Sequence, residues 1–205
     1  MTGLTNFSLA FIFSFAGSIP PGTINLTVVQ LGLDDRVKIA LRFSIAASIV
    51  EYPYAWIAVK FEKVITSSPV ITENLQIISA LVFIVLGIIN VWPRKAHDSG
   101  VMSKFSNSGY RRGLLLGILN PLSIPYWIGI TAYLQSQRWI LLDSATRLHA
   151  YLCGVVAGGF LLLVALTYLS KKVMQGLVQF PWIRKIPGYL LLTLGFYGLA
   201  VYLLK

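Results

Sequence analysis

Six long apolar runs occupy most of this 205-residue chain, and they constrain its fold more than any other feature of the sequence. Each run is close to the roughly 17–25 residues that a helix needs to cross a lipid bilayer. We therefore expect an all-α integral membrane protein with six transmembrane helices, forming a single membrane domain over residues 1–205. The runs cover about Phe7–Leu31, Val37–Val59, Leu75–Trp92, Gly113–Leu134, Leu148–Leu169 and Ile186–Leu204.

The composition also indicates a membrane protein. Apolar residues make up 56% of the chain and charged residues 12%, whereas soluble proteins carry roughly 25% charged residues. In a soluble protein the net charge of +10 would indicate a nucleic-acid partner. Here the basic residues lie between the apolar runs, so the positive-inside rule explains them and no nucleic-acid partner is expected.

The basic residues are divided unequally between the two sets of run ends. Five lie at the two termini and in the loops after the second and fourth runs. Twelve lie in the loops after the first, third and fifth runs. Both termini are therefore expected outside, with the polar linker 93–112 in the cytoplasm. That linker separates three runs at about 4–92 from three at about 113–205. Because each group holds an odd number of spans, the second group inserts upside down, and we expect two inverted three-helix repeats.

Proline interrupts the first and fourth runs near mid-length, with Pro21 and Pro121 one hundred residues apart. Non-helical backbone at that depth in a bilayer survives only against protein or a water-filled cavity. Matching interruptions in two halves are the best sequence indication of a transporter's substrate site. We therefore expect helices 1 and 4 to be broken, and the protein to be a transporter.

Glu51 is the one acidic residue well inside an apolar run. A charged side chain there costs about 2.5–3.5 kcal/mol, so Glu51 must face a partner or a cavity. Ser44, Ser48 and Glu51 share one face of the predicted helix. A buried carboxyl group is suited to reversible protonation, so we expect Glu51 to contact substrate or carry a proton. A hydrogen-bonded glutamate that only fixes helix packing is the alternative.

A new half-helix is expected to begin after each interruption. Its first backbone amides have no intrahelical acceptor, and together with the helix dipole they attract an anion such as a substrate carboxylate. Polar side chains near these ends extend the predicted binding site. The predicted substrate-binding residues are Pro21, Gly22, Thr23, Asn25, Ser48, Glu51, Asn120, Pro121, Ser123 and Tyr126.

No metal site, cofactor or enzyme activity is expected. His97 and His149 have no histidine or cysteine partner at ligand spacing, and the nucleotide-binding and metalloprotease motifs are absent from the sequence. A divalent-cation site usually takes several oxygen ligands, and Glu51 is a single carboxylate. By contrast, Gly113-x-x-x-Gly117 and Gly154-x-x-x-Gly158 predict close packing of neighbouring helices.

The sequence resembles the LysE/RhtB-type amino-acid exporters of the lysine exporter superfamily. The resemblance is carried by a Pro-Gly break in Ser18–Leu26 and a Gly…Asn-Pro motif in Gly113–Pro121, within a similar length and six-span layout. It implies export of amino acids or close derivatives across the inner membrane of a bacterium, driven by the proton-motive force as in an antiporter. It also implies a homodimer. Pro20-Pro21-Gly22-Thr23 and Glu51-Tyr52-Pro53-Tyr54 depart from the usual pattern and leave the substrate open.

The expected mechanism is alternating access, with the two three-helix halves rocking around the site. The half-helix ends at Gly22–Asn25 and Asn120–Ser123 hold the carboxylate of the amino acid, and Glu51 pairs with its ammonium group or exchanges a proton. One buried acid favours a neutral amino acid over lysine. A metal or other small-ion exporter of the same superfamily, and a non-transporting membrane assembly factor or enzyme subunit, remain as alternatives.

Overall fold

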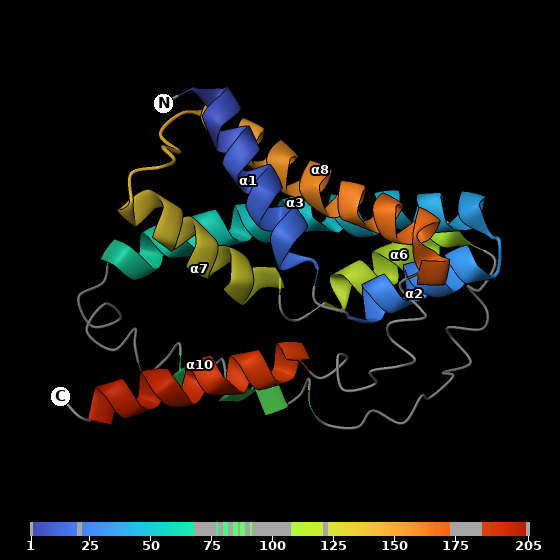
Figure 1. The fold of residues 1–205 in the computed structure, drawn as a ribbon. Helices are drawn as coiled ribbons and strands as arrows, with labels where there is room; N and C mark the ends of the chain where they lie inside the picture. Colours follow the sequence, from blue (N-terminus) through green and yellow to red (C-terminus); the bar gives the residue numbers. More distant parts are fainter. Residues whose placement is uncertain are drawn as a thin grey trace.

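The computed structural model describes residues 2–19, 22–67, 108–120, 123–172 and 186–203, with single positions between 77 and 91. All the elements in this part of the chain are helices, as the sequence predicts (Figure 1). They are α1 (Gly3–Gly17), α2 (Thr23–Leu33), α3 (Val37–Ser67), α6 (Gly109–Ile118), α7 (Ser123–Ser136), α8 (Ala145–Tyr168) and α10 (Ile186–Leu203).

Three helices begin at hydroxyl side chains that satisfy a free backbone amide. Thr2, Ser108 and Ser144 precede α1, α6 and α8, and each accepts a hydrogen bond from the amide three residues later. Such N-caps stabilise a helix by about 1 kcal/mol. Local sequence therefore fixes where these helices start.

The structure contains both predicted interruptions. In the first run α1 ends at Gly17 and α2 begins at Thr23, and in the fourth α6 ends at Ile118 and α7 begins at Ser123. The axes of α6 and α7 differ in direction by 65°. The prolines that motivated the prediction, Pro21 and Pro121, lie outside the described residues.

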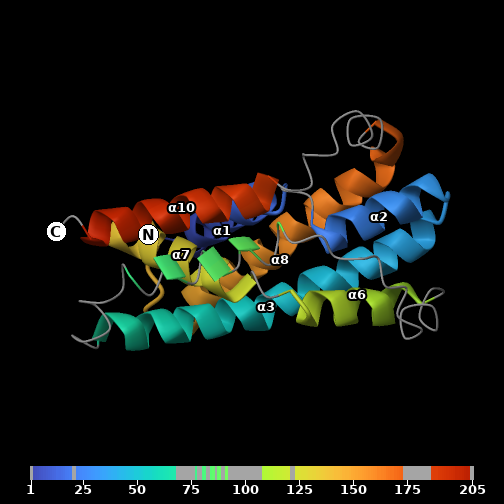
Figure 2. The same cartoon turned by 90° about the horizontal axis from the view of Figure 1, so that it is seen from below.

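The second run forms one unbroken helix that is longer than predicted. The sequence predicts an end near Val59, whereas α3 continues to Ser67. Pro53 lies within it, and because proline has no amide hydrogen, one backbone carbonyl of α3 lacks its helical partner. The length of α3 lets it contact α6, α7 and α8, all from the second half of the sequence (Figure 2).

Glycines bring α1 against α8. A Cβ atom on Gly154 or Gly158 would lie 2.3 Å from the carbonyl oxygen of Phe7 or Phe11, respectively. The same close approach joins α6 to α3, where a Cβ on Gly113 would lie 2.4 Å from a backbone oxygen. The predicted packing role of the two glycine motifs is therefore confirmed at these positions.

Large apolar side chains remain exposed on the described helices, as a bilayer-facing surface requires. Ile12, Leu114 and Leu161 are 57%, 43% and 46% exposed. Among the described residues, α8 alone is long and apolar enough to cross a bilayer, and the bent pair α6–α7 adds a second span if counted as one. Most of the predicted third span, Leu75–Trp92, lies outside the described residues, so the six-span inverted repeat stays a prediction.

Candidate functional site

The carboxylate of Glu51 lies between α3 and the first turn of α7. Its Oε1 accepts a hydrogen bond of 2.7 Å from Ser123 Oγ, and its Oε2 accepts one of 2.9 Å from Trp127 Nε1. Ser123 is the first residue of α7, so the bond holds the helix at the point where the second interruption ends. Ser123 and Trp127 are four residues apart and therefore share one face of α7.

The hydrogen-bond network around Glu51 has a defined direction. Asn120 Nδ2 donates to Ser123 Oγ over 2.8 Å, so the single hydroxyl hydrogen of Ser123 is free to point at Glu51. An indole N–H can only donate. Both carboxylate oxygens therefore accept, and bonds of this kind are roughly twice as strong when the carboxylate is ionised as when it is neutral.

Tyr126 connects the second interruption to the first. Its hydroxyl donates to the carbonyl oxygen of Phe13 over 2.7 Å, within the last turns of α1. The glycine at position 17 leaves room for the phenol, because a Cβ there would lie 2.0 Å from the hydroxyl oxygen. A second tyrosine, Tyr54 of α3, donates to the carbonyl of Ile118 at the end of α6 over 2.5 Å. Tyr126 of α7 thus bonds the last turns of α1, and Tyr54 of α3 bonds the end of α6.

Asn25 links the two sides of the first interruption by a hydrogen bond. Its Nδ2 donates to the carbonyl oxygen of Ser18 over 2.6 Å, and the side chain is buried. Gly22, the N-cap of α2, and Thr23 are exposed, and Gly22 supplies no side-chain capping bond. The first interruption therefore presents its backbone amides, while Asn25 bridges the two half-helices.

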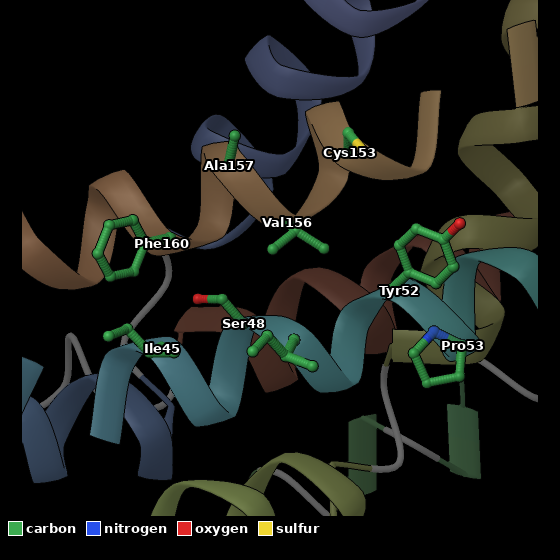
Figure 3. A pocket seen from close by; sticks show the side chains of 9 residues that line it. Ile45, Ser48, Tyr52, Pro53, Cys153, Val156, Ala157 and Phe160 are labelled. Carbon is green, nitrogen blue, oxygen red and sulfur yellow. The ribbon is translucent and has the colours of Figure 1, made fainter. Parts of the chain in front are cut away.

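A groove with a volume of about 490 Å³ lies between α3 and α8, one turn away from Glu51 (Figure 3). Ser48 lines it, together with apolar residues that include Ile45, Val156 and Phe160. Ser48 is 2% exposed, and its Oγ has no hydrogen-bond partner among the residues that the structure describes. The groove thus contains one buried, unsatisfied hydroxyl in apolar surroundings.

The family comparison agrees with this architecture. The family model of the LysE type translocators matches residues 15–203, which include both interruptions and Glu51. The chain belongs to the LysE type translocator family. The resemblance seen in the sequence is thereby confirmed, and this LysE type translocator is a membrane transport protein. No curated protein and no solved structure gives a significant match.

The translocator brings together only part of the predicted site. Glu51, Asn120 and Ser123 form one network. Tyr126 instead points to α1, and Ser48 faces the groove. Pro21 and Pro121 lie outside the described residues. Within the described part of the chain, no group of three or more His, Cys, Asp or Glu side chains is placed to hold a metal ion.

Sequence reasoning missed Trp127, the second donor to Glu51. Its side chain is 2% exposed and lies edge-on to Tyr126 and Tyr151, with ring centroids 5.1 and 6.1 Å away. The available signal was its spacing, four residues after Ser123 on the same helix face. Because an indole N–H in lipid needs an acceptor, the one carboxylate inside an apolar run could have been assigned to it.

Proposed function

We propose that this LysE type translocator exports amino acids or close derivatives across the cytoplasmic membrane by proton-coupled alternating access. The observation that carries the proposal is the pair of hydrogen bonds from Ser123 and Trp127 to Glu51. They join the one acid of the second apolar run to the helix that starts at the second interruption. A proton on that acid therefore acts directly on the broken helix.

Protonation of Glu51 weakens this set of bonds. A proton on Oε2 leaves that oxygen a poorer acceptor for the Trp127 N–H, which can only donate. A proton on Oε1 would require Ser123 to turn its own hydrogen away while still accepting from Asn120. In either case the bonds between α3 and α7 lose their charge assistance and become roughly half as strong, so proton binding favours a different position of the first turn of α7.

The substrate is proposed to bind at the two interruptions. The exposed amide end of α2 at Gly22 and Thr23 suits a carboxylate, as does the start of α7 near Ser123. The ammonium group of the substrate would compete with Ser123 and Trp127 for the Glu51 carboxylate. A substrate that binds Glu51 thus weakens the same bonds that a proton weakens, which supports exchange of the two.

The proposed orientation follows from charge. The distribution of the basic residues supports both termini outside and the 93–112 linker in the cytoplasm of a bacterium. The two halves are proposed to be inverted repeats that rock around Glu51. A homodimer is proposed from the family resemblance.

Efflux from proteoliposomes tests the function. The purified full-length protein is reconstituted with a panel of labelled amino acids inside, with and without a pH gradient. We expect efflux of at least one amino acid that the pH gradient accelerates, and loss of that acceleration in Glu51→Gln. Asp143→Asn is the matched control, because Asp143 is an exposed acid paired only with Arg147 at 2.7 Å. No efflux of any amino acid by the wild type, or a Glu51→Gln variant as active as Asp143→Asn, would refute the proposal.

A further inference from the structure

The α3–α8 groove has the size and lining of a small-molecule site. Such sites measure roughly 300–1,000 Å³ and are mainly apolar with few placed polar groups, and this groove has about 490 Å³. Its lining comes from one face of α3 and one of α8, and of the described residues that line it none is charged (Figure 3). The groove therefore suits an uncharged, largely apolar group.

The hydroxyl of Ser48 distinguishes this groove from a lipid-facing crevice. Other buried hydroxyls on these helices bond to the carbonyl one turn earlier, as Ser44 does to Ala40 and Thr167 to Leu163, both over 2.9 Å. Ser48 makes no such bond, and its Oγ is buried at the groove. A buried hydroxyl without a partner destabilises the structure around it. A lipid acyl chain offers no hydrogen-bonding group to Ser48, whereas a small solute with a polar atom does.

We propose that the α3–α8 groove binds the apolar side chain of the transported solute, with Ser48 bonding a polar atom next to that side chain. The inference rests on the proposed export function and makes the groove the specificity-determining part of the site. The solute class is then a neutral amino acid, or close derivative, with a branched or aromatic side chain. The polar atom at Ser48 belongs to the ammonium or carboxylate group of the solute, because such a side chain carries none, and the second charged group lies outside the groove, whose described lining offers no counter-charge.

The location next to Glu51 is consistent with this role. Ser48 and Glu51 are three residues apart on α3, so a solute with its side chain in the groove lies within one helical turn of the carboxylate. At the far side, the hydroxyl of Tyr52, which lines the groove, is hydrogen-bonded to Nδ1 of His149 at the start of α8. That bond fixes the spacing of α3 and α8 at one end of the groove.

Thermal unfolding of the full-length protein in lipid nanodiscs tests the inference with three probes: L-leucine, L-phenylalanine and glycine. Glycine carries the same charged groups without a side chain. A ligand that binds only the folded state raises the melting temperature. We expect leucine or phenylalanine to raise it at concentrations where glycine does not. An equal effect of all three probes, or no effect of any, would overturn the inference.

Three substitutions locate the effect. Ala157→Phe fills the groove and is expected to abolish the shift. Ser48→Ala removes the hydroxyl and is expected to weaken binding about fivefold, the value of one hydrogen bond. Ser44→Ala is the control, because it removes a buried serine hydroxyl one turn away that does not line the groove, and we expect unchanged binding. Unchanged binding in Ala157→Phe and Ser48→Ala would place the ligand elsewhere and overturn the inference.

The native thiol gives an independent readout. Cys153 is the only cysteine in the sequence, and it is exposed at the groove. We expect leucine or phenylalanine to slow its reaction with N-ethylmaleimide severalfold, and glycine not to. Combined with the efflux assay, the readouts separate the two proposals. If Ala157→Phe still exports amino acids with the same substrate preference as the wild type, the binding role of the groove alone is refuted. If ligands bind the groove but no amino acid is exported, the export function alone is refuted.

Discussion

Replacement of Trp127 by phenylalanine isolates the hydrogen bond that sequence reasoning missed. The substitution keeps an aromatic ring among Tyr126 and Tyr151 but removes the N–H that bonds Glu51 Oε2 at 2.9 Å. A hydrogen bond to a charged group contributes about 1.5–3 kcal/mol. The smaller ring adds about 1 kcal/mol of lost packing. We therefore expect Trp127→Phe to lower the free energy of unfolding by about 2.5–4 kcal/mol.

The assay is unfolding in mixed micelles by titration with sodium dodecyl sulfate, followed by circular dichroism. Trp139→Phe is the matched control, because Trp139 is 44% exposed whereas Trp127 is 2% exposed. The control is expected to change the free energy of unfolding by less than about 0.5 kcal/mol, as surface substitutions do.

A double-mutant cycle separates the hydrogen bond from the packing. In a Glu51→Met background the acceptor is gone, so Trp127→Phe should cost only its packing part. The expected coupling energy is therefore about 1.5–3 kcal/mol. A coupling below about 0.5 kcal/mol, the usual limit for independent sites, would refute the reasoning that Glu51 depends on Trp127.

Two further predictions concern glycines at helix contacts. Gly17→Ala places a methyl group 2.0 Å from the Tyr126 hydroxyl, so Tyr126 must move. The free energy of unfolding should fall by about 1–3 kcal/mol. A change below about 0.5 kcal/mol in the same titration would contradict the contact. Gly158→Ala places one 2.3 Å from a backbone oxygen of α1, with an expected loss of about 1–3 kcal/mol. Gly159→Ala is its control, since the new methyl would meet only side-chain oxygens at 3.5 and 3.9 Å; equal effects at 158 and 159 would exclude tight α1–α8 packing as the cause.

The two helix interruptions could be predicted because their cause is local. Proline lacks an amide hydrogen and collides with the preceding turn, so Pro21 and Pro121 favour a break from local sequence, although Pro53 inside the unbroken α3 shows that one proline does not always produce one. The sequence could predict that Glu51 accepts hydrogen bonds from other polar side chains, since a carboxylate in lipid needs donors. Which donors it meets depends on how α3 and α7 cross, and the sequence of either helix alone does not contain that information.

Other features depend on contacts between distant segments. Tyr126 has a polar tip suited to substrate binding, yet it donates to Phe13, more than one hundred residues away in sequence. The end of α3 was misplaced for a different reason. The apolar run stops near Val59 because Lys60 and Glu62 follow. Lysine and glutamate are good helix formers, so the helix continues beyond the apolar run and ends at Ser67.

The central claim is that the Glu51 carboxylate holds the first turn of α7 and holds it less tightly when it takes a proton. Hydrogen–deuterium exchange of the peptide spanning residues 118–130, corrected for the intrinsic pH dependence of exchange, measures this directly. We expect faster corrected exchange at low pH than at high pH in the wild type, and fast exchange at both pH values in Glu51→Gln. Identical, pH-independent exchange in the two proteins would contradict the account.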